Sequence, residues 1–223
     1  MLKKHVRDGL VDYAALKAAP APLDAYLAAL AAVLEAEFKI WSEPQRLALL
    51  INLYNAATLR LILDHYPLKS IRSIGLMPGA AWKKEGVAFF GKKISLDHIE
   101  HGIIRKDYPD ARAHFALVCA ARGCPPLRSE PFVADRLAAQ LDDQGRIFLG
   151  DTAKNRVEAA TRTVHLSAIF KWFSGDFVAA SGTVLKFVTP FFPEPARAAL
   201  AAGGDFKIAF TAYDWSLNEQ AKQ

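Results

Sequence analysis

The most constraining feature of the sequence is the long apolar stretch at residues 43–65, because it carries its own start signal. Ser42 stands before Glu43 and Pro44, and Gln45 occupies the capping-box position. Apolar residues then recur at helical spacing, and the pattern ends before Pro67. The sequence therefore predicts a helix over 43–65, which we expect to pack behind a small sheet.

Shorter patterns along the rest of the chain mix helices with hairpins and do not alternate regularly. The predicted helices are 22–38, 96–105, 132–149, 169–173 and 194–202, and the predicted strands are a hairpin at 86–96 around Gly91, 114–119, 162–166 and 206–212. This mixture favours an α+β fold, with helices packed on a small, mainly antiparallel sheet that contains 114–119. We find no composition break and predict a single domain over 1–223.

Composition and charge exclude several classes of protein. The chain is 52% hydrophobic and 23% charged, and we find no apolar run of the roughly 20 residues that a membrane span needs. Its net charge of +5 is scattered, so nucleic-acid binding is not expected. The first residues lack a signal core, which indicates either a cytoplasmic protein or a leader removed before residue 1.

Ionisable residues gather in the predicted helix 96–105. Asp97 and His101 are one turn apart, so the carboxylate can orient the imidazole, and Arg105 lies one turn further on. Glu100 lies about a quarter-turn away from this stripe. An ordinary surface helix with ion pairs is an equally good interpretation. We weigh His98 with His101 as a metal pair, but no further ligands follow at a recognisable spacing, and no metal is predicted.

Two asparagines, Asn52 and Asn55, lie on one face of the predicted helix 43–65, among apolar residues. A buried amide needs hydrogen-bond partners. The asparagines either tie the helix to the backbone of a neighbouring loop or point into a polar site.

The two cysteines of the chain, Cys119 and Cys124, lie close together in the sequence. Cys119 is expected in the core. Gly123 before Cys124 permits an unusual backbone, and Pro125 with Pro126 stiffens the chain behind it, so we expect the Cys124 sulfur at the edge of a strand. Cys124 is then either a nucleophile or half of a Cys119–Cys124 disulfide, as an oxidising compartment would favour.

A cysteine nucleophile needs a neighbouring base. His114 is excluded by the predicted strand, because a rise of about 3.3 Å per residue places it roughly 16 Å from Cys119. His101, on a separate element, is the preferred base.

Several motifs, in order, resemble the domain of unknown function 547 family over nearly the whole chain. The matching segments are 11–13, 51–56, 94–105, 114–127, 166–173 with 176–177, and 213–218. The resemblance supports a fold and a site more than it supports a particular reaction, because the family has no settled activity. The chain departs from it at Ala120 and Gly123, where the family tends to have glycine and serine. Bacterial relatives resemble exported proteins with a leader, so the resemblance favours an exported protein.

The function expected from these residues is thiol-dependent acyl transfer or amide hydrolysis on a small-molecule or peptide substrate, without a cofactor. Cys124 would attack a carbonyl carbon, with His101 as base and Asp97 as its orienting group. The amide of Asn52 would stabilise the oxyanion. The expected substrate-binding residues are Glu100, Arg105 and Asn55, with Arg105 reading a substrate carboxylate. The alternative is a non-catalytic ligand- or protein-binding domain with a structural cysteine pair.

Overall fold

The computed structural model describes residues 1–221 and has α+β architecture, as the sequence predicted. The α-helices are α1 (Leu2–His5), α2 (Tyr13–Ala18), α3 (Ala21–Ala31), α4 (Glu35–Ile40), α5 (Glu43–His65), α6 (Ala80–Lys83), α7 (Arg105–Asp107), α8 (Leu137–Gly150), α9 (Ile169–Trp172), α10 (Ser174–Ser181), α11 (Val184–Val188) and α12 (Ala196–Ala201). The strands are β1 (Val6–Arg7), β2 (Leu10–Val11), β3 (Val87–Phe89), β4 (Lys92–Ile94), β5 (Arg156–Glu158), β6 (Thr163–Ser167) and β7 (Lys207–Thr211).

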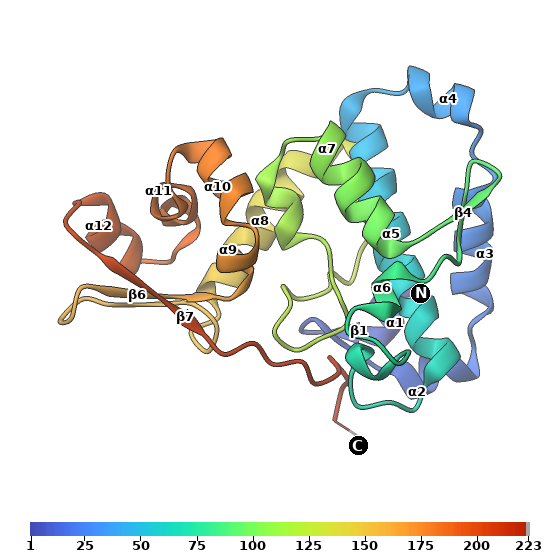
Figure 1. Cartoon of the computed structure of the whole chain (residues 1–223), viewed down its shortest axis with the longest axis horizontal. Coiled ribbons are helices and arrows are strands. Elements are labelled where there is room, and N and C mark those ends of the chain that lie inside the picture. Colours follow the sequence, from blue (N-terminus) through green and yellow to red (C-terminus); the bar gives the residue numbers. More distant parts are fainter. Residues whose placement is uncertain (222–223) are drawn as a thin grey trace.

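Helix α5 runs through the larger half of the molecule and is covered by other elements along most of its length (Figure 1). Its capping box forms as predicted, with the Ser42 N–H donating to the side-chain oxygen of Gln45 over 2.9 Å. By length and mean hydropathy (1.3 over an 18-residue window) α5 could cross a membrane, yet 78% of that window is buried inside the protein. The absence of a membrane span stays a prediction from the sequence.

The helix predicted over 22–38 is broken into α3 and α4. Helix α3 ends at Ala31, and the turn before α4 leaves the Leu34 side chain 68% exposed, so Leu34 does not belong to the packing face. The break re-aims Phe38 toward the β3–β4 hairpin, where its ring lies 5.2 Å from that of Phe90. The hairpin itself forms as predicted, and Phe90 and Gly91 at its tip both have positive φ, as a two-residue loop of this kind requires.

The strand predicted over 114–119 is wrong. Residues Ala111–Phe115 form a 3₁₀ helix, which begins where the Asp110 carboxylate accepts the Arg112 N–H. His114 and Phe115 are both buried, so the inside–outside alternation of a strand is lost. The backbone after this turn is paired with the Asn55 side chain instead of a neighbouring strand.

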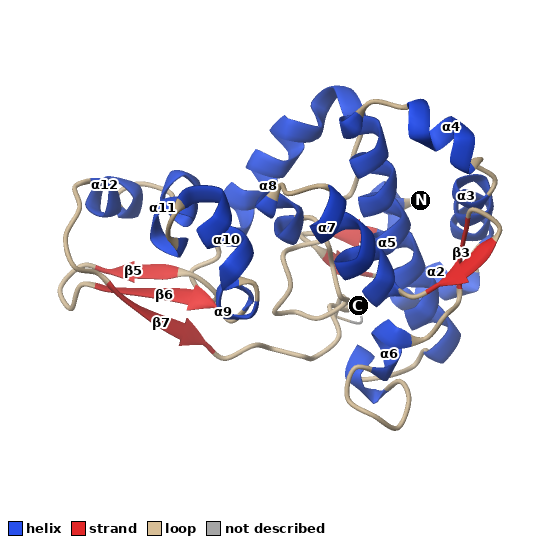
Figure 2. Ribbon diagram, turned by 45° about the horizontal axis from the view of Figure 1, so that its top comes forward, coloured by secondary structure: helices blue, strands red, loops and turns tan. Residues whose placement is uncertain are grey.

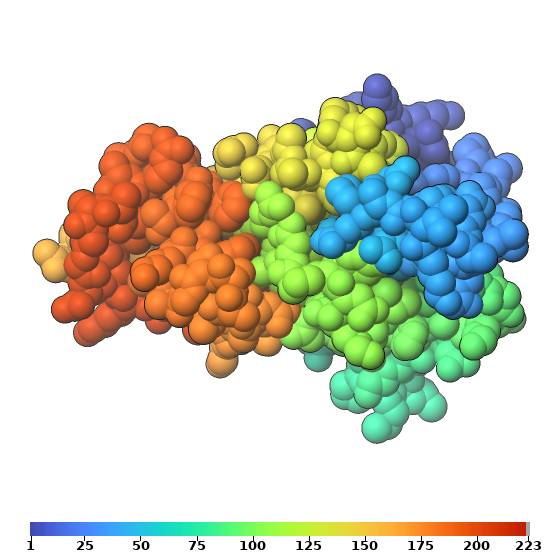
Figure 3. Space-filling view, turned by 90° about the horizontal axis from the view of Figure 1, so that it is seen from above, coloured from blue at the N-terminus to red at the C-terminus, as the bar shows by residue number. Residues whose placement is uncertain are grey.

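The three-stranded sheet is formed by the C-terminal part of the chain and consists of β5, β6 and β7, with β6 in the centre. Strand β5 is antiparallel to β6, whereas β7 is parallel to it. A parallel neighbour needs a long crossover, and here the crossover carries α9 to α12. Helices α10, α11 and α12 lie over one face of this sheet (Figure 2). The space-filling view shows the part after about residue 155 as a lobe at one end of the molecule (Figure 3).

Other predicted elements are found with shifted ends. Strands β6 and β7 and helices α9 and α12 match their predictions within a few residues. Helix α8 begins at Leu137 rather than 132, because the Phe132 and Val133 N–H groups are taken by the side chains of Asn52 and Gln140.

The segment after β7 crosses from the sheet to the other half of the molecule and fastens the loop that carries the cysteines. The Arg122 N–H donates to the Ser216 carbonyl and the Gly123 N–H to the Asp214 carbonyl, each over 2.8 Å. The same segment reaches the start of the chain, where the Tyr13 hydroxyl donates to Asn218 over 2.6 Å. This segment therefore closes the fold around the cysteine loop.

Candidate functional site

The two cysteines form a disulfide at the floor of a pocket of about 250 Å³. Cys124 is only 2% exposed, whereas Cys119 is partly exposed. The pocket lies where the two halves of the molecule meet. Its walls are formed by Tyr54, Gly79, Trp82, Lys83, Asp97, Glu100, His101, His114, Leu117, Ile169, Trp172, Phe173, Tyr213 and Trp215.

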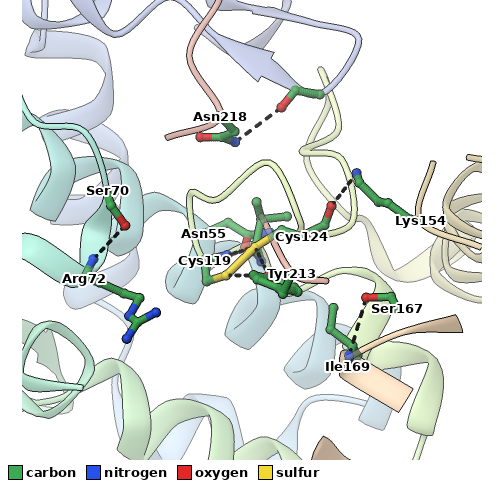
Figure 4. The surroundings of a disulfide bond; sticks show 12 residues. Asn55, Ser70, Arg72, Cys119, Cys124, Lys154, Ser167, Ile169, Tyr213 and Asn218 are labelled. Carbon is green, nitrogen blue, oxygen red and sulfur yellow. Dashed lines mark hydrogen bonds between the residues drawn. A yellow bond between two sulfur atoms is a disulfide. The ribbon is translucent and has the colours of Figure 1, made fainter. Parts of the chain in front are cut away.

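The segment that carries the two cysteines is held from three sides. Asn55 of α5 donates to the Ala116 carbonyl over 2.8 Å and accepts the Val118 N–H over 2.9 Å. The Lys154 ammonium donates to the Cys124 carbonyl over 3.0 Å (Figure 4). The third support is the segment after β7, described above. The disulfide therefore sits on a fixed backbone.

Tyr213 covers the disulfide. Its hydroxyl lies 3.1 Å from the sulfur of Cys124 and 3.2 Å from that of Cys119 (Figure 4). Gly123 makes room for this ring, because a Cβ at Gly123 would lie 2.9 Å from three of its carbon atoms. The unusual backbone expected at Gly123 occurs instead at Ala120, whose φ is 58°.

Glu100 is the buried charge of the pocket. The π-helical winding of His98–Ile104 turns its side chain inward, where it is 9% exposed beside the buried Tyr54 hydroxyl. Burial raises the pKa of the Glu100 carboxyl, against the lowering effects of Tyr54 and Arg105. Within residues 1–221, Glu100 has no salt bridge to a basic side chain.

His101 and Asp97 both line the pocket, with His101 Nε2 3.7 Å from Asp97 Oδ1. The other ring nitrogen, Nδ1, lies 3.0 Å from Nη1 of Arg105. A guanidinium can only donate, so this Nδ1 carries no proton and the ring is the neutral Nε2–H tautomer. In this arrangement His101 has no free lone pair to act as a base.

His114, which the predicted strand had excluded, lines the same pocket, because the 3₁₀ turn brings its ring back to the wall. Its Nε2 lies 2.7 Å from Asp176 Oδ2, and its ring stacks on Phe173 with the centroids 4.2 Å apart. Ionised Asp176 can only accept, so His114 carries its proton on Nε2 and leaves Nδ1 free. Burial lowers the pKa of His114, although Asp176 raises it.

The remaining predicted site residues lie outside this pocket. Arg105 makes a two-pronged ion pair with Asp176, at 2.7 and 2.8 Å, and holds the pKa of that carboxyl at about 2. Asn52 exchanges hydrogen bonds with the Phe132 backbone, and Asn55 with Ala116 and Val118. Both asparagines therefore tie α5 to loops, which is one of the two interpretations that the sequence left open.

Sequence reasoning missed the aromatic side of the pocket. Trp82, Trp172, Tyr213 and Trp215 form a contiguous cluster with ring centroids 4.5–6.0 Å apart. Tryptophan clusters in a sequence usually indicate packing, and these residues come from three distant segments. In the sequence, the signal for this cluster is the closely spaced aromatic pair Tyr213 and Trp215, which lies in a segment that matches the family motifs.

Another cavity, of about 280 Å³, lies between α3, α5 and the β3–β4 hairpin. Two of its charged side chains are paired, since Arg60 contacts Asp64 at 2.8 Å and also Asp24 at 3.1 Å. Among the described residues no group of three or more His, Cys, Asp or Glu side chains is arranged to hold a metal ion. The candidate functional site is therefore the pocket above the disulfide.

Together, the fold and the site define an α+β protein with an aromatic pocket above a disulfide. A family model described as "Protein of unknown function, DUF547" matches residues 38–149, half of the chain. The chain belongs to this family, as the sequence motifs indicated. The comparisons matched neither a curated protein nor a solved structure.

Proposed function

We propose that this chain is a non-catalytic binding domain that holds a small molecule or the end of a peptide in the pocket above the Cys119–Cys124 disulfide. The observation that carries the proposal is the state of Cys124, which is 2% exposed and bonded to Cys119. A disulfide sulfur cannot act as a thiolate nucleophile. The pocket in front of it is lined mainly by apolar surface, to which six Phe, Trp and Tyr rings contribute, as is usual for ligand sites.

A second candidate function, thiol-dependent acyl transfer, is favoured by one observation: the His114–Asp176 pair lines the same pocket as the cysteines. An external dithiol would first reduce the disulfide and be oxidised itself. His114 Nδ1 would then take the Cys124 proton, and the sulfur would bond to the carbonyl carbon. The leaving group would depart with that proton, and water would release the acid.

The two candidates are separated by an acyl-transfer assay with p-nitrophenyl acetate on the oxidised and the dithiothreitol-reduced protein. The binding-domain proposal predicts that reduced wild type releases nitrophenol no faster than Cys124→Ser, which keeps the shape but lacks the thiol. A stoichiometric burst from reduced wild type and Cys119→Ser, absent from Cys124→Ser, would replace the proposal with the second candidate. Thermal unfolding of each variant checks that it is folded.

A further inference from the structure

We infer that the ligand of this pocket is an organic cation, an ammonium group held between the aromatic cluster and the Glu100 carboxylate. The inference rests on the proposed binding function and names its ligand class. It draws on two independent features, the aromatic cluster and the unpaired buried carboxylate.

The aromatic cluster gives the pocket electron-rich ring faces. Three of the four tryptophans of the chain line it, together with Tyr213. Ring faces attract cations, and tryptophan does so most strongly. The cluster already holds one cation away from the pocket, since the Arg72 guanidinium lies 5.1 Å from the Trp215 ring centroid (Figure 4 shows Arg72 near the cysteine loop).

The Glu100 carboxylate supplies the negative charge. It lines the pocket, is 9% exposed and has no salt bridge within the part of the chain described. A buried charge is costly unless it is paired. Burial therefore raises the pKa of Glu100, and a bound cation would stabilise its ionised form.

The other charged side chains of the pocket lining do not supply a positive partner for Glu100. Asp97 adds a second carboxylate, and the imidazole of His101 is neutral by the argument above. The one ammonium in the lining, that of Lys83, belongs to an exposed residue. An anion would face two carboxylates and the negative ring faces, and a neutral ligand would leave Glu100 unpaired.

Choline and its uncharged carbon analogue, 3,3-dimethylbutan-1-ol, test the inference because they differ in charge and hardly in shape. Binding to the oxidised protein is followed by tryptophan fluorescence and by calorimetry, with acetate as the anionic probe. We expect choline to bind at least ten times more tightly than either. Equal or tighter binding of the alcohol or of acetate would overturn the inference while leaving a binding domain in place. Failure of choline to bind overturns it as well.

Two charge-removing variants test whether choline binding depends on the Glu100 carboxylate in the pocket. Glu100→Gln keeps the shape and is expected to weaken choline at least tenfold while changing the alcohol less than twofold. Glu37→Gln, the same charge change at an exposed position, should leave both affinities unchanged. An unchanged choline affinity in folded Glu100→Gln would contradict the role of the carboxylate. The proposed function itself fails on a different result, the Cys124-dependent burst.

Discussion

Gly123 illustrates how a single missing side chain shapes the site, because its bare Cα leaves the space that the Tyr213 ring fills. Gly123→Ala would place a Cβ 2.9 Å from that ring and push the hydroxyl away from the sulfurs. We expect a loss of about 1–3 kcal/mol in the free energy of unfolding, as for other overpacked sites. We also expect several-fold faster reduction of the disulfide by dithiothreitol, because access limits thiol exchange.

Gly175→Ala provides the control, since a Cβ there meets no atom within 4 Å. Urea unfolding and the rate of thiol release measure the two effects. A Gly123→Ala protein as stable and as slowly reduced as the control would show that Tyr213 does not protect the disulfide.

His114 sets a pH dependence of stability. Burial lowers the pKa of His114 in the folded protein, with Asp176 opposing this effect and Arg105 adding to it. The unfolded chain therefore binds the proton more readily, so this residue makes the free energy of unfolding fall as pH drops below about 6.5. The slope from one proton is at most about 1.4 kcal/mol per pH unit.

The measurement compares wild type with His114→Gln by urea unfolding between pH 7.5 and 5. Glu100, whose pKa is raised, acts in the opposite direction, but it is present in both proteins. Asp176 titrates lower, near 2. The wild-type stability should fall more steeply toward pH 5 than that of the variant, and parallel curves would refute the assignment.

At the scale of elements, α5 positions the cysteine loop through its asparagines. Asn55 is 8% exposed and satisfies one backbone N–H and one carbonyl of the segment before Cys119. Asn55→Ala leaves both groups buried without partners, which should cost about 2–4 kcal/mol. Asn52→Ala is the matched change at a less buried position, where water can replace the amide, and should cost about 1 kcal/mol. Denaturant unfolding measures the stability of both variants. A larger loss of stability in Asn52→Ala than in Asn55→Ala would contradict this ranking.

The elements that the sequence predicted well are those encoded by neighbouring residues. Helix α5 carries its own capping box, and the β3–β4 hairpin carries Gly91 at its tip. The strand predicted over 114–119 is wrong because a short apolar run is also compatible with a buried 3₁₀ turn. Its actual partner, the Asn55 side chain, is a long-range contact that periodicity does not reveal.

The same distinction explains the site. Asp97, Glu100 and His101 lie on one helical segment, so their proximity followed from spacing, and Cys124 was singled out by its flanking residues. His114 was not predicted to line the site, because the strand wrongly predicted over 114–119 placed it far from the cysteines. The aromatic wall could not be predicted, because Trp82, Trp172 and Trp215 meet only through the course of the whole chain.

For the whole molecule, the disulfide closes a short loop, with a sequence separation of 5. Chain entropy alone predicts that its loss lowers the free energy of unfolding by about 2 kcal/mol. In a domain of this size that corresponds to a fall in Tm of about 4–8 °C. Calorimetry of the Cys119→Ala, Cys124→Ala double variant measures it, and dithiothreitol should lower the Tm of wild type but not of the double variant. An unchanged Tm after verified reduction would show that the bond adds no stability.

The cover over the sulfurs also has a consequence for biosynthesis. The hydroxyl of Tyr213 contacts a cysteine 89 positions earlier in the chain. At about 5–20 residues per second, a ribosome makes Cys124 about 4–18 seconds before Tyr213. Both thiols are therefore synthesised before Tyr213 is available to cover them. In that interval an oxidant can reach them more easily than in the finished protein.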